Sequence, residues 1–519
     1  MANKLKMLMM VVLGLSTVLS FAPFYGALVP MATLAVWVVL IERASSVRQA
    51  LWLGMAWGVG FFGLGVQWVY TTVYTIGGMP QLLGAVMYGL FALYLSLYPA
   101  FVAMAMKWIR QRSREYSLYA VWGLVFPVLW VISEWLRGEG SLGFNWLTLG
   151  YSQVGVTPLV GWARWVGVYG VSYWVVAFAG VLGVLCLQCG EESLGSKPRQ
   201  WMFSSPLSLA LLVLGGGVCA LGEWALHHSW TQPGTSLHVS LIQGNVPQEN
   251  KWDDQWQLGI FKRYTRLLNQ AKGHLVVVPE TALPVLRHQL PRVWVEELQS
   301  TFRKEGRTAL LGLVERSDAM GHYYNSIWTY GQYSEQDYRK RHLVPFGEFV
   351  PGIQWLSFFE RWWTMPLAAF GRGVVDPSPL KLGQGVVLAP SICYEDGFSS
   401  LFQGQAEQAT VLLNVSNDAW FGDGIAIDQH LQIAQMRSIE SAKPMIRANN
   451  TAGTAVIDAS GRVVQQLPHF KEGILESEVL TQIGVTPFMH YGESLTLMLC
   501  AVSVLCAWGV SGMNRKAAS

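Results

Sequence analysis

Long apolar runs limit what this chain can fold into more than any other feature of its sequence. A helix needs on the order of 20 predominantly apolar residues to cross a bilayer. Eight runs approach or exceed that length, at about residues 5–23, 25–41, 51–73, 81–106, 117–136, 168–189, 207–226 and 494–512. Only 13% of the residues are charged, whereas ordinary soluble domains carry about 25%. We therefore expect a membrane protein with a bundle of eight transmembrane helices.

Basic residues in the short connections predict how these spans are oriented. Lys and Arg gather in the cytoplasmic loops of membrane proteins. Twelve of them lie in alternate connections and near the two ends of the sequence: Lys4, Lys6, Arg43, Arg48, Lys107, Arg110, Arg112, Arg114, Lys197, Arg199, Arg515 and Lys516. The short loops on the other side contain two, Arg137 and Arg164. We expect both termini in the cytoplasm and the long polar stretch on the outer side of the membrane.

The first apolar run allows a second interpretation. Lys4 and Lys6 before an apolar core, with small residues near Ala22, are also typical of a cleaved signal peptide. We expect an uncleaved span, because a second apolar run follows almost at once. The formal net charge of +3 is small and spread over the inner loops, so it gives no case for nucleic-acid binding.

The chain divides into three parts: residues 1–230 with seven spans, the mostly polar residues 231–490, and residues 491–519 with the last span and a tail. Patterns typical of strands and helices alternate through the middle part, which predicts one layered α/β domain. The expected strands are 235–243, 275–278, 309–314, 386–392, 410–415 and 454–458, and the expected helices are 253–272 and 428–442. As a whole, the fold class is an α+β membrane protein.

Three predicted strand ends in the polar part carry conspicuous side chains. Glu280 follows one apolar run, Lys340 precedes the strand-like pair Leu343-Val344, and Cys393 ends another run. A single glutamate, lysine or cysteine is more often structural. The three types together are a rarer combination, and strand ends are where layered α/β folds display catalytic side chains.

A carboxylate, an ammonium and a thiol are suited to acyl transfer. A thiol is mostly protonated at neutral pH, so a carboxylate base must accept its proton as it attacks. The attack creates an oxyanion, which an ammonium can stabilise. A second carboxylate would keep that ammonium charged and placed. Glu348 and Glu395 are candidates for this supporting role, although each could instead cap a turn or pair elsewhere.

The phrases around these residues resemble the carbon–nitrogen hydrolase (nitrilase) superfamily, whose members use a Glu-Lys-Cys triad. The three phrases are Val278-Pro-Glu280-Thr-Ala, Tyr338-Arg-Lys340-Arg-His-Leu-Val-Pro-Phe-Gly-Glu348 and Ile392-Cys393-Tyr-Glu395-Asp. Further matching stretches are Gln243-Gly-Asn245-Val-Pro-Gln, Lys251-Trp252, Tyr324-Asn325-Ser326 and Asn414-Val-Ser-Asn417-Asp418-Ala-Trp420. With seven spans before and one after, the chain resembles the membrane-embedded members that acylate bacterial lipoproteins. The resemblance implies a periplasmic α-β-β-α sandwich domain in a protein of the inner membrane.

What the resemblance further implies is a two-step reaction without a cofactor. Glu280 would take the proton of Cys393, the thiolate would attack the sn-1 ester of a phospholipid such as phosphatidylethanolamine, and Lys340 would stabilise the oxyanion. The N-terminal amine of a diacylated apolipoprotein, an S-diacylglyceryl cysteine, would then discharge the thioester. The expected partners are therefore a phospholipid acyl donor and a lipoprotein acceptor, and the expected state is a monomer.

Other residues near the three phrases have two interpretations each. Tyr394 either shapes the oxyanion site or packs, and Trp252 and Trp420 either contact substrate or serve as core or membrane-surface anchors. The Trp-rich stretch 355–370 is either a loop that dips into the membrane interface or a core helix. His342 follows the lysine without any partner at a metal-ligand spacing, so we expect no metal site.

Two other functions are compatible with parts of the sequence. A membrane-anchored amidase or nitrilase would hydrolyse its thioester with water, and the three residues alone do not exclude it. A non-enzymatic transporter or scaffold with a decayed domain is disfavoured by the intact triad. It is also disfavoured by spans that hold few charges, Glu134 and Glu223 being exceptions near span ends.

Overall fold

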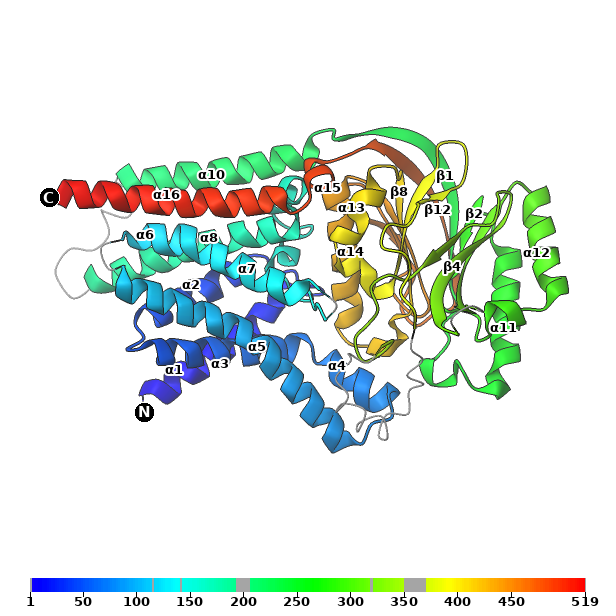
Figure 1. Cartoon of the computed structure of the whole chain (residues 1–519), viewed down its shortest axis with the longest axis horizontal. Helices are drawn as coiled ribbons and strands as arrows, with labels where there is room; N and C mark the ends of the chain where they lie inside the picture. The colour runs from blue at the N-terminus through cyan, green and yellow to red at the C-terminus, as the bar shows by residue number, and fades with distance from the viewer. Residues whose placement is uncertain are drawn as a thin grey trace. The chain divides into compact units, whose positions relative to one another are not determined.

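The computed structural model describes residues 2–113, 116–140, 142–192, 206–317, 321–349 and 370–518. These residues form two compact units (Figure 1). The first comprises residues 1–67, 86–228 and 491–519, and the second comprises residues 68–85 and 229–490. Residues 68–85 therefore belong with the polar part of the chain, although the sequence pattern assigned them to the region of the spans.

Each of the eight apolar runs contains a helix. These helices are α1 (Ala2–Thr17), α2 (Val29–Glu42), α3 (Val47–Gly65), α5 (Gln81–Arg112), α6 and α7 (Leu118–Ala120 and Phe126–Gly138), α8 (Ala163–Glu192), α10 (Pro206–His227) and α16 (Ser494–Ala518). Glycines let neighbouring helices approach closely. A Cβ on Gly14 of α1 would lie 2.1 Å from the carbonyl oxygen of Trp57 in α3, and one on Gly60 would lie 2.1 Å from that of Val11.

Fewer than eight of the described helices are long enough to cross a membrane by themselves. Five helices of the described residues are long and apolar enough to cross a membrane, or six if the bent pair Val47–Gly65 and Trp68–Ile76 forms one span. Val29–Glu42 and Ser494–Val510 are apolar but shorter. The chain is a multi-pass membrane protein, and its predicted count of eight spans stays a prediction.

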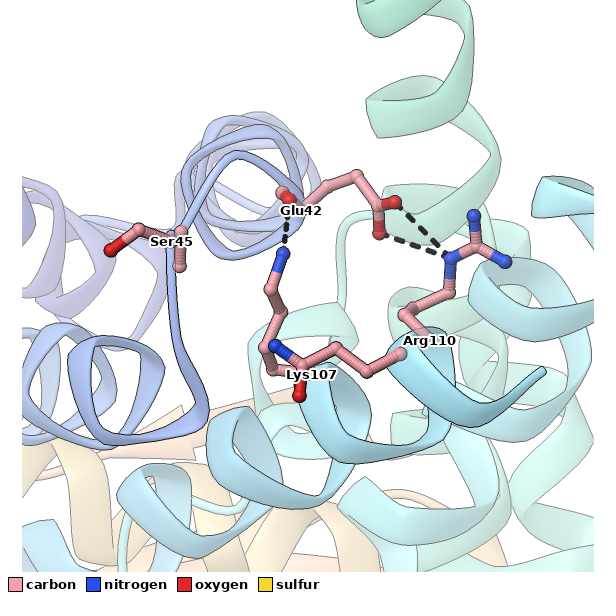
Figure 2. A pocket seen from close by; sticks show the side chains of 6 residues that line it. Glu42, Ser45, Lys107 and Arg110 are labelled. Carbon is pink, nitrogen blue, oxygen red and sulfur yellow. Dashed lines mark hydrogen bonds and ion pairs between the residues drawn. The ribbon is translucent and has the colours of Figure 1, made fainter. Parts of the chain in front are cut away.

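The buried charges of the first unit serve its packing. Glu134 accepts hydrogen bonds from Trp130 Nε1 at 3.0 Å and from the backbone N–H of Leu149 at 2.8 Å. A polar hollow of about 420 Å³ lies beside the C-terminal end of α2 (Figure 2). There Lys107 Nζ donates to the carbonyl of Glu42 at 2.6 Å, and Arg110 Nε lies 3.2 Å from both oxygens of the Glu42 carboxylate. Of the residues that the sequence singled out, this hollow contains Lys107 and Arg110, two of the basic residues expected on the cytoplasmic side, and none of the candidate site residues.

The second unit is built on two six-stranded mixed sheets. The first has the strand order β12-β1-β2-β3-β4-β5 and the second β11-β10-β9-β8-β7-β6. The strands of the first are β1 (Thr231–Gln243), β2 (Leu275–Val277), β3 (Thr308–Arg316), β4 (Tyr323–Gly331), β5 (Asp337–Arg339) and β12 (Gly473–Gly484). Those of the second are β6 (Leu380–Lys381), β7 (Val387–Ile392), β8 (Val411–Ser416), β9 (Met445–Asn449), β10 (Ala455–Ile457) and β11 (Val463–Gln466). Three central strands of each sheet are parallel, β1–β3 and β7–β9.

Helices cover the outer face of each sheet, so the layers follow the order helix, sheet, sheet, helix (Figure 1). Apolar side chains of α11 (Asp254–Gln270) and α12 (Arg292–Lys304) pack on the first sheet, and those of α13 (Ser400–Ala406) and α14 (Ala426–Ser441) pack on the second. The parallel strands β2, β3 and β8 are buried on both faces, which explains why they read as mostly apolar runs.

One predicted strand is wrong. Leu343-Val344 is not extended in a sheet, and the strand next to the lysine is β5, which ends just before Lys340. Pro345 and the positive φ of Phe346 (63°) turn the chain there. Lys340 is thus a residue that follows a strand, as Glu280 and Cys393 are.

Candidate active site

Cys393 stands at the point where β7 ends and a 3₁₀ turn, Cys393–Gly397, begins. Its φ of +54° lies in the left-handed region, which costs a non-glycine residue of order 1–3 kcal/mol and persists only where the surroundings hold it. The turn displays the thiol at the carboxyl end of a central parallel strand. The side chain of Asn414 on the neighbouring β8 donates to the Cys393 carbonyl at 3.2 Å.

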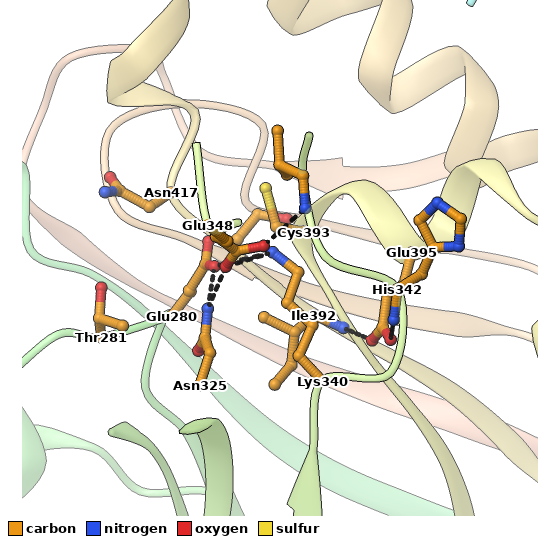
Figure 3. Close-up of polar contacts among 12 residues, drawn as sticks. Glu280, Thr281, Asn325, Lys340, His342, Glu348, Ile392, Cys393, Glu395 and Asn417 are labelled. Atoms are coloured by element: carbon orange, nitrogen blue, oxygen red, sulfur yellow. Dashed lines mark hydrogen bonds and ion pairs between the residues drawn. The ribbon is translucent and has the colours of Figure 1, made fainter. Parts of the chain in front are cut away.

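Glu280, Lys340 and Glu348 converge beside this turn (Figure 3). Lys340 Nζ lies 2.9 Å from Glu348 Oε1 and 3.5 Å from Glu280 Oε1. Asn325 on β4 donates through Nδ2 to the same two oxygens, at 2.6 Å from Glu280 and 3.1 Å from Glu348. One ammonium and one amide therefore hold the buried Glu280 carboxylate and the partly exposed Glu348 carboxylate in fixed positions. The sequence left open whether Glu348 or Glu395 pairs with Lys340. In the structure Glu348 makes this pair.

The electrostatics of the site keep the thiol protonated at rest. Burial and the neighbouring Glu280 raise the pKa of Cys393 well above its ordinary value, and Lys340 offsets only part of this. Burial lowers the pKa of Lys340, but Glu348 and Glu280 outweigh it and raise that pKa above its ordinary value. An ammonium that stays charged thus lies beside a thiol that needs a base before it can attack.

Glu395 holds the Cys393 turn rather than pairing with the lysine. Its Oε1 accepts from the backbone N–H groups of Arg341 at 2.7 Å and His342 at 3.0 Å. Its Oε2 accepts from the N–H of Ile392 and the hydroxyl of Tyr338, both at 2.8 Å. Burial raises the pKa of Glu395, and the backbone donors oppose that rise. This carboxylate ties the segment after Lys340 to the strand end that carries the thiol.

The remaining residues named from the sequence lie in different surroundings. Tyr394 is buried, with its ring edge-on to Phe398 at 5.1 Å between centroids. Trp252 is 47% exposed. The carbonyl of Trp420 accepts a hydrogen bond from Thr72 Oγ1 at 2.8 Å. Of the Trp-rich stretch 355–370, all but Phe370 lies outside the described residues.

Sequence reasoning gave no role to Lys251. Its side chain is 1% exposed and donates to Thr281 Oγ1 at 2.8 Å and to the carbonyl of Glu280 at 3.3 Å. Burial lowers its pKa to about 8, against the opposite effects of Glu280 and Cys393. A single lysine next to a tryptophan gives no sequence signal of burial, so only the fold reveals this contact.

Sequence reasoning also missed a second set of buried charges next to the Cys393 turn, which we name the Asp–His–Arg cluster. It consists of Asp396, Asp418, His430 and Arg447, all with side chains no more than 1% exposed. His430 Nε2 lies 2.9 Å from Asp396 Oδ1, and His430 Nδ1 lies 2.9 Å from Asp418 Oδ1. Arg447 donates to Asp396 Oδ2 at 2.5 Å and to Asp418 Oδ2 at 3.0 Å.

This cluster predicts a pH-dependent stability. Burial and Arg447 lower the pKa of His430, but Asp396 and Asp418 outweigh them and raise it from 6.5 to about 9. A group with a raised pKa stabilises the fold fully below its unfolded pKa, and that contribution is lost as pH rises through the folded pKa. We expect the apparent unfolding temperature in detergent to fall between pH 6.5 and about 9. In His430→Gln the unfolding temperature should fall less over this pH range. If it falls as much as in the wild type, the predicted role of His430 in pH-dependent stability is wrong.

Among the described residues, no group of three or more His, Cys, Asp or Glu side chains is arranged to hold a metal ion. The residues at the site instead supply a thiol, two carboxylates, two ammonium groups and amide donors. Such a set can accept a proton, form a covalent acyl intermediate and stabilise an oxyanion.

Comparison with known proteins gives two family matches that together cover most of the chain. Residues 13–181 match the model described as apolipoprotein N-acyltransferase N-terminal domain, and residues 238–484 match the carbon-nitrogen hydrolase model. The chain is 38% identical to an apolipoprotein N-acyltransferase of Nitrosomonas europaea over 494 residues, 95% of each protein. It is 38% identical to one of Ralstonia nicotianae over 510 residues, covering 95% of this chain and 91% of that protein. A third, of Chromobacterium violaceum, is 34% identical over 495 residues, with 95% and 92% covered.

Proposed function

Because the chain belongs to the apolipoprotein N-acyltransferase family, we propose that Cys393 is the nucleophile through which it transfers an acyl chain. The protein is a membrane-bound acyltransferase of lipoprotein maturation. The observation that carries the proposal is the convergence of Glu280 and Lys340, held by Asn325 and Glu348, beside the strained turn that displays the thiol.

In the first proposed step, the Glu280 carboxylate takes the proton of the Cys393 thiol as sulfur attacks the sn-1 ester carbonyl of a phospholipid. The oxyanion that forms is stabilised by the Lys340 ammonium. When the carbon–oxygen bond breaks, the lysophospholipid alkoxide takes the proton from Glu280 and leaves. Cys393 then carries the acyl chain as a thioester.

In the second proposed step, the free α-amine of an S-diacylglyceryl cysteine attacks the thioester carbonyl. Glu280 takes a proton from the attacking nitrogen, an amide bond forms, and the Cys393 sulfur leaves and regains its proton. A thioester suits this sequence because it waits for the second substrate and yet reacts readily with amines. Ping-pong kinetics follow from the shared intermediate.

The supporting residues have separate proposed roles. Glu348 keeps Lys340 charged and placed, and Glu395 fixes the turn of Cys393. Tyr394 and Trp252 border the site, where Trp252 retains enough exposure to contact a substrate. All of these residues come from one chain, so we propose that a monomer is active, with residues 231–490 as its catalytic domain.

Labelled substrates test the proposed reaction against hydrolysis by water. The protein is incubated with a phospholipid labelled in its sn-1 acyl chain, with and without a diacylated lipopeptide that has a free amine. We expect label on the lipopeptide amine and one lysophospholipid released for each amide formed. Free fatty acid released at the same rate without the lipopeptide would instead identify a hydrolase.

Lys340→Ala should slow formation of the acyl-enzyme by about 10²–10³-fold, the usual loss when one oxyanion donor is removed. It also leaves the Glu280 and Glu348 carboxylates without the ammonium that lies between them. Single-turnover measurements with phospholipid alone isolate this step. Lys381→Ala, which removes an exposed lysine of β6, serves as the control. A Lys340→Ala protein that acylates at the wild-type rate would rule out the proposed role.

The orientation of the chain in the membrane gives a further prediction. We propose that both termini lie in the cytoplasm and that the catalytic domain lies in the periplasm, because twelve Lys and Arg residues occupy the connections on one side. A reporter that is active only in the periplasm should be active when fused near Gly306 and inactive when fused at either terminus. A cytoplasmic signal from the fusion near Gly306 would overturn the orientation.

A further inference from the structure

We propose that the Asp–His–Arg cluster positions the Cys393 turn and sets the charge that its thiol faces, an inference that rests on the proposed role of Cys393. The cluster joins four separate segments of the chain. Asp396 belongs to the turn that begins at Cys393, Asp418 begins a second turn after β8, His430 lies on α14 and Arg447 lies on β9. None of these residues belongs to the triad.

The cluster forms a closed ring of hydrogen bonds. Each carboxylate uses one oxygen for a nitrogen of the His430 ring and the other oxygen for a nitrogen of Arg447. A doubly protonated imidazole donates to both carboxylates in this arrangement. Arg447 Nη2 also lies 2.7 Å from His430 Nδ1, a contact between two donors that the surrounding carboxylates must outweigh.

The ring is balanced in charge when His430 is protonated. Two carboxylates then face one guanidinium and one imidazolium, and the sum is zero. Loss of one partner leaves a net charge in a fully buried place, where an unpaired charge is strongly destabilising. The protein therefore has a physical reason to keep all four residues ionised together.

Two adjacent residues hold the Cys393 turn from different directions. Glu395 ties it to Tyr338 and to the backbone after Lys340. Asp396 ties it to α14 and β9 through His430 and Arg447. A turn whose first residue has a positive φ needs such anchors to persist. The two carboxylates together explain how a strained cysteine keeps one position.

The cluster also acts on the thiol through its charges. Asp418 contributes to the raised pKa of Cys393, and the guanidinium of Arg447 interacts favourably with the thiolate. The net charge of the cluster therefore changes how readily the Cys393 thiolate forms. A variant that adds a net negative charge should make Cys393 harder to ionise, and a variant that restores the balance should reverse this.

Charge-changing variants separate this role from simple structural support. His430→Gln leaves a net charge of −1 in the ring, and the double variant Asp396→Asn/His430→Gln returns it to zero. The readout is the rate at which Cys393 is alkylated by iodoacetamide as a function of pH. At each pH below about 9, where wild-type His430 is protonated, we expect His430→Gln to react about tenfold more slowly, and the difference should disappear at higher pH. The double variant should recover most of that loss.

A control variant accounts for loss of stability alone. Lys443→Met removes another buried cation, one that donates to the carbonyls of Ala409, Gln482 and Gly484. It should lower the unfolding temperature and leave the alkylation profile in place. If the double variant reacts no better than His430→Gln, or if Lys443→Met shifts the profile equally, the cluster is only structural and the proposal is wrong.

The test remains decisive if a variant does not fold or if the proposed function fails. Where His430→Gln yields no folded protein, Asp396→Asn changes the ring charge in the opposite sense and should shift the profile to lower pH. An unshifted profile would contradict the proposal. Alkylation does not depend on acyl transfer, so the effect of the cluster on Cys393 is measured even if phospholipid leaves no adduct on the wild-type enzyme.

Discussion

Cys393→Ala is expected to abolish both half-reactions while the protein remains folded. Alanine removes the sulfur that forms the thioester, and it changes a small buried side chain into a slightly smaller one. Neither lysophospholipid release nor amide formation should exceed the background without enzyme. Both are measured with a labelled phospholipid and a lipopeptide acceptor, and an unfolding curve checks that the fold is retained.

Cys393→Ser sharpens this prediction because it keeps the shape of the side chain. A hydroxyl is a far poorer nucleophile than a thiol at neutral pH, so this variant should form little or no acyl-enzyme. Turnover by the alanine variant above background would rule out Cys393 as the nucleophile. If the serine variant turns over and the alanine variant does not, residue 393 still supplies the nucleophile.

Glu280→Gln should reduce acyl-enzyme formation by about 10²–10⁴-fold, the range that general acid–base catalysis contributes. An amide of nearly the same shape still accepts a hydrogen bond from Asn325 but does not take the thiol proton. The burial that raises the pKa of Cys393 makes the loss severe, since little thiolate exists without a base. Single-turnover rates measured over a range of pH test this directly.

The pH dependence of this variant distinguishes a lost base from a disturbed site. If Glu280 is the base, the residual rate of Glu280→Gln should rise with pH as hydroxide replaces it. Glu407→Gln, which removes an exposed carboxylate that pairs with His490, serves as the control and should match the wild type. A Glu280→Gln rate within a few fold of the wild-type rate would exclude the proposed base.

The sequence was enough to predict the parallel strands β1, β2, β3, β7 and β8, but it missed the parallel strand β9 and the edge strand β5 that precedes Lys340. Strands such as β3 and β8 are buried on both faces, so they appear as uninterrupted apolar runs that are easily recognised. Glu280, Lys340 and Cys393 lie at or just beyond strand ends in phrases that resemble a known family. The resemblance supplied their association, and the folded chain brings Glu280 and Lys340 to within 3.5 Å of each other.

The Asp–His–Arg cluster shows why other parts of the site could not be predicted. Its members are separated by at least 12 residues in sequence, and the aspartates and the arginine are of types that are usually exposed. Helix α14 is buried on all sides although it contains His430, Gln432 and Arg437. Its sequence therefore lacks the apolar stripe that indicates which face of a helix is buried. Pairing of His430 with Asp396 and Asp418, and of Arg437 with Glu440 in the same helix, offsets the cost of burying these charges.

The segment that follows α3 illustrates a different limit of sequence analysis. Residues 51–73 form one apolar run, yet the helix ends at Gly65 and residues 68–85 cluster with the second unit. There the Trp68 ring packs at 4.6 Å from the ring of Phe421. An apolar side chain satisfies a lipid environment and a protein core equally well, so hydropathy alone does not separate the two.

Mass spectrometry of the intact protein after exposure to phospholipid alone tests the proposed mechanism most directly. We expect an added mass equal to one acyl chain, located on Cys393, removed by neutral hydroxylamine and absent from Cys393→Ala. A lipopeptide amine should discharge the adduct quickly, and water should do so only slowly. A catalytically active protein that forms no adduct under single-turnover conditions, or an adduct that persists in Cys393→Ala, would contradict a thioester at Cys393.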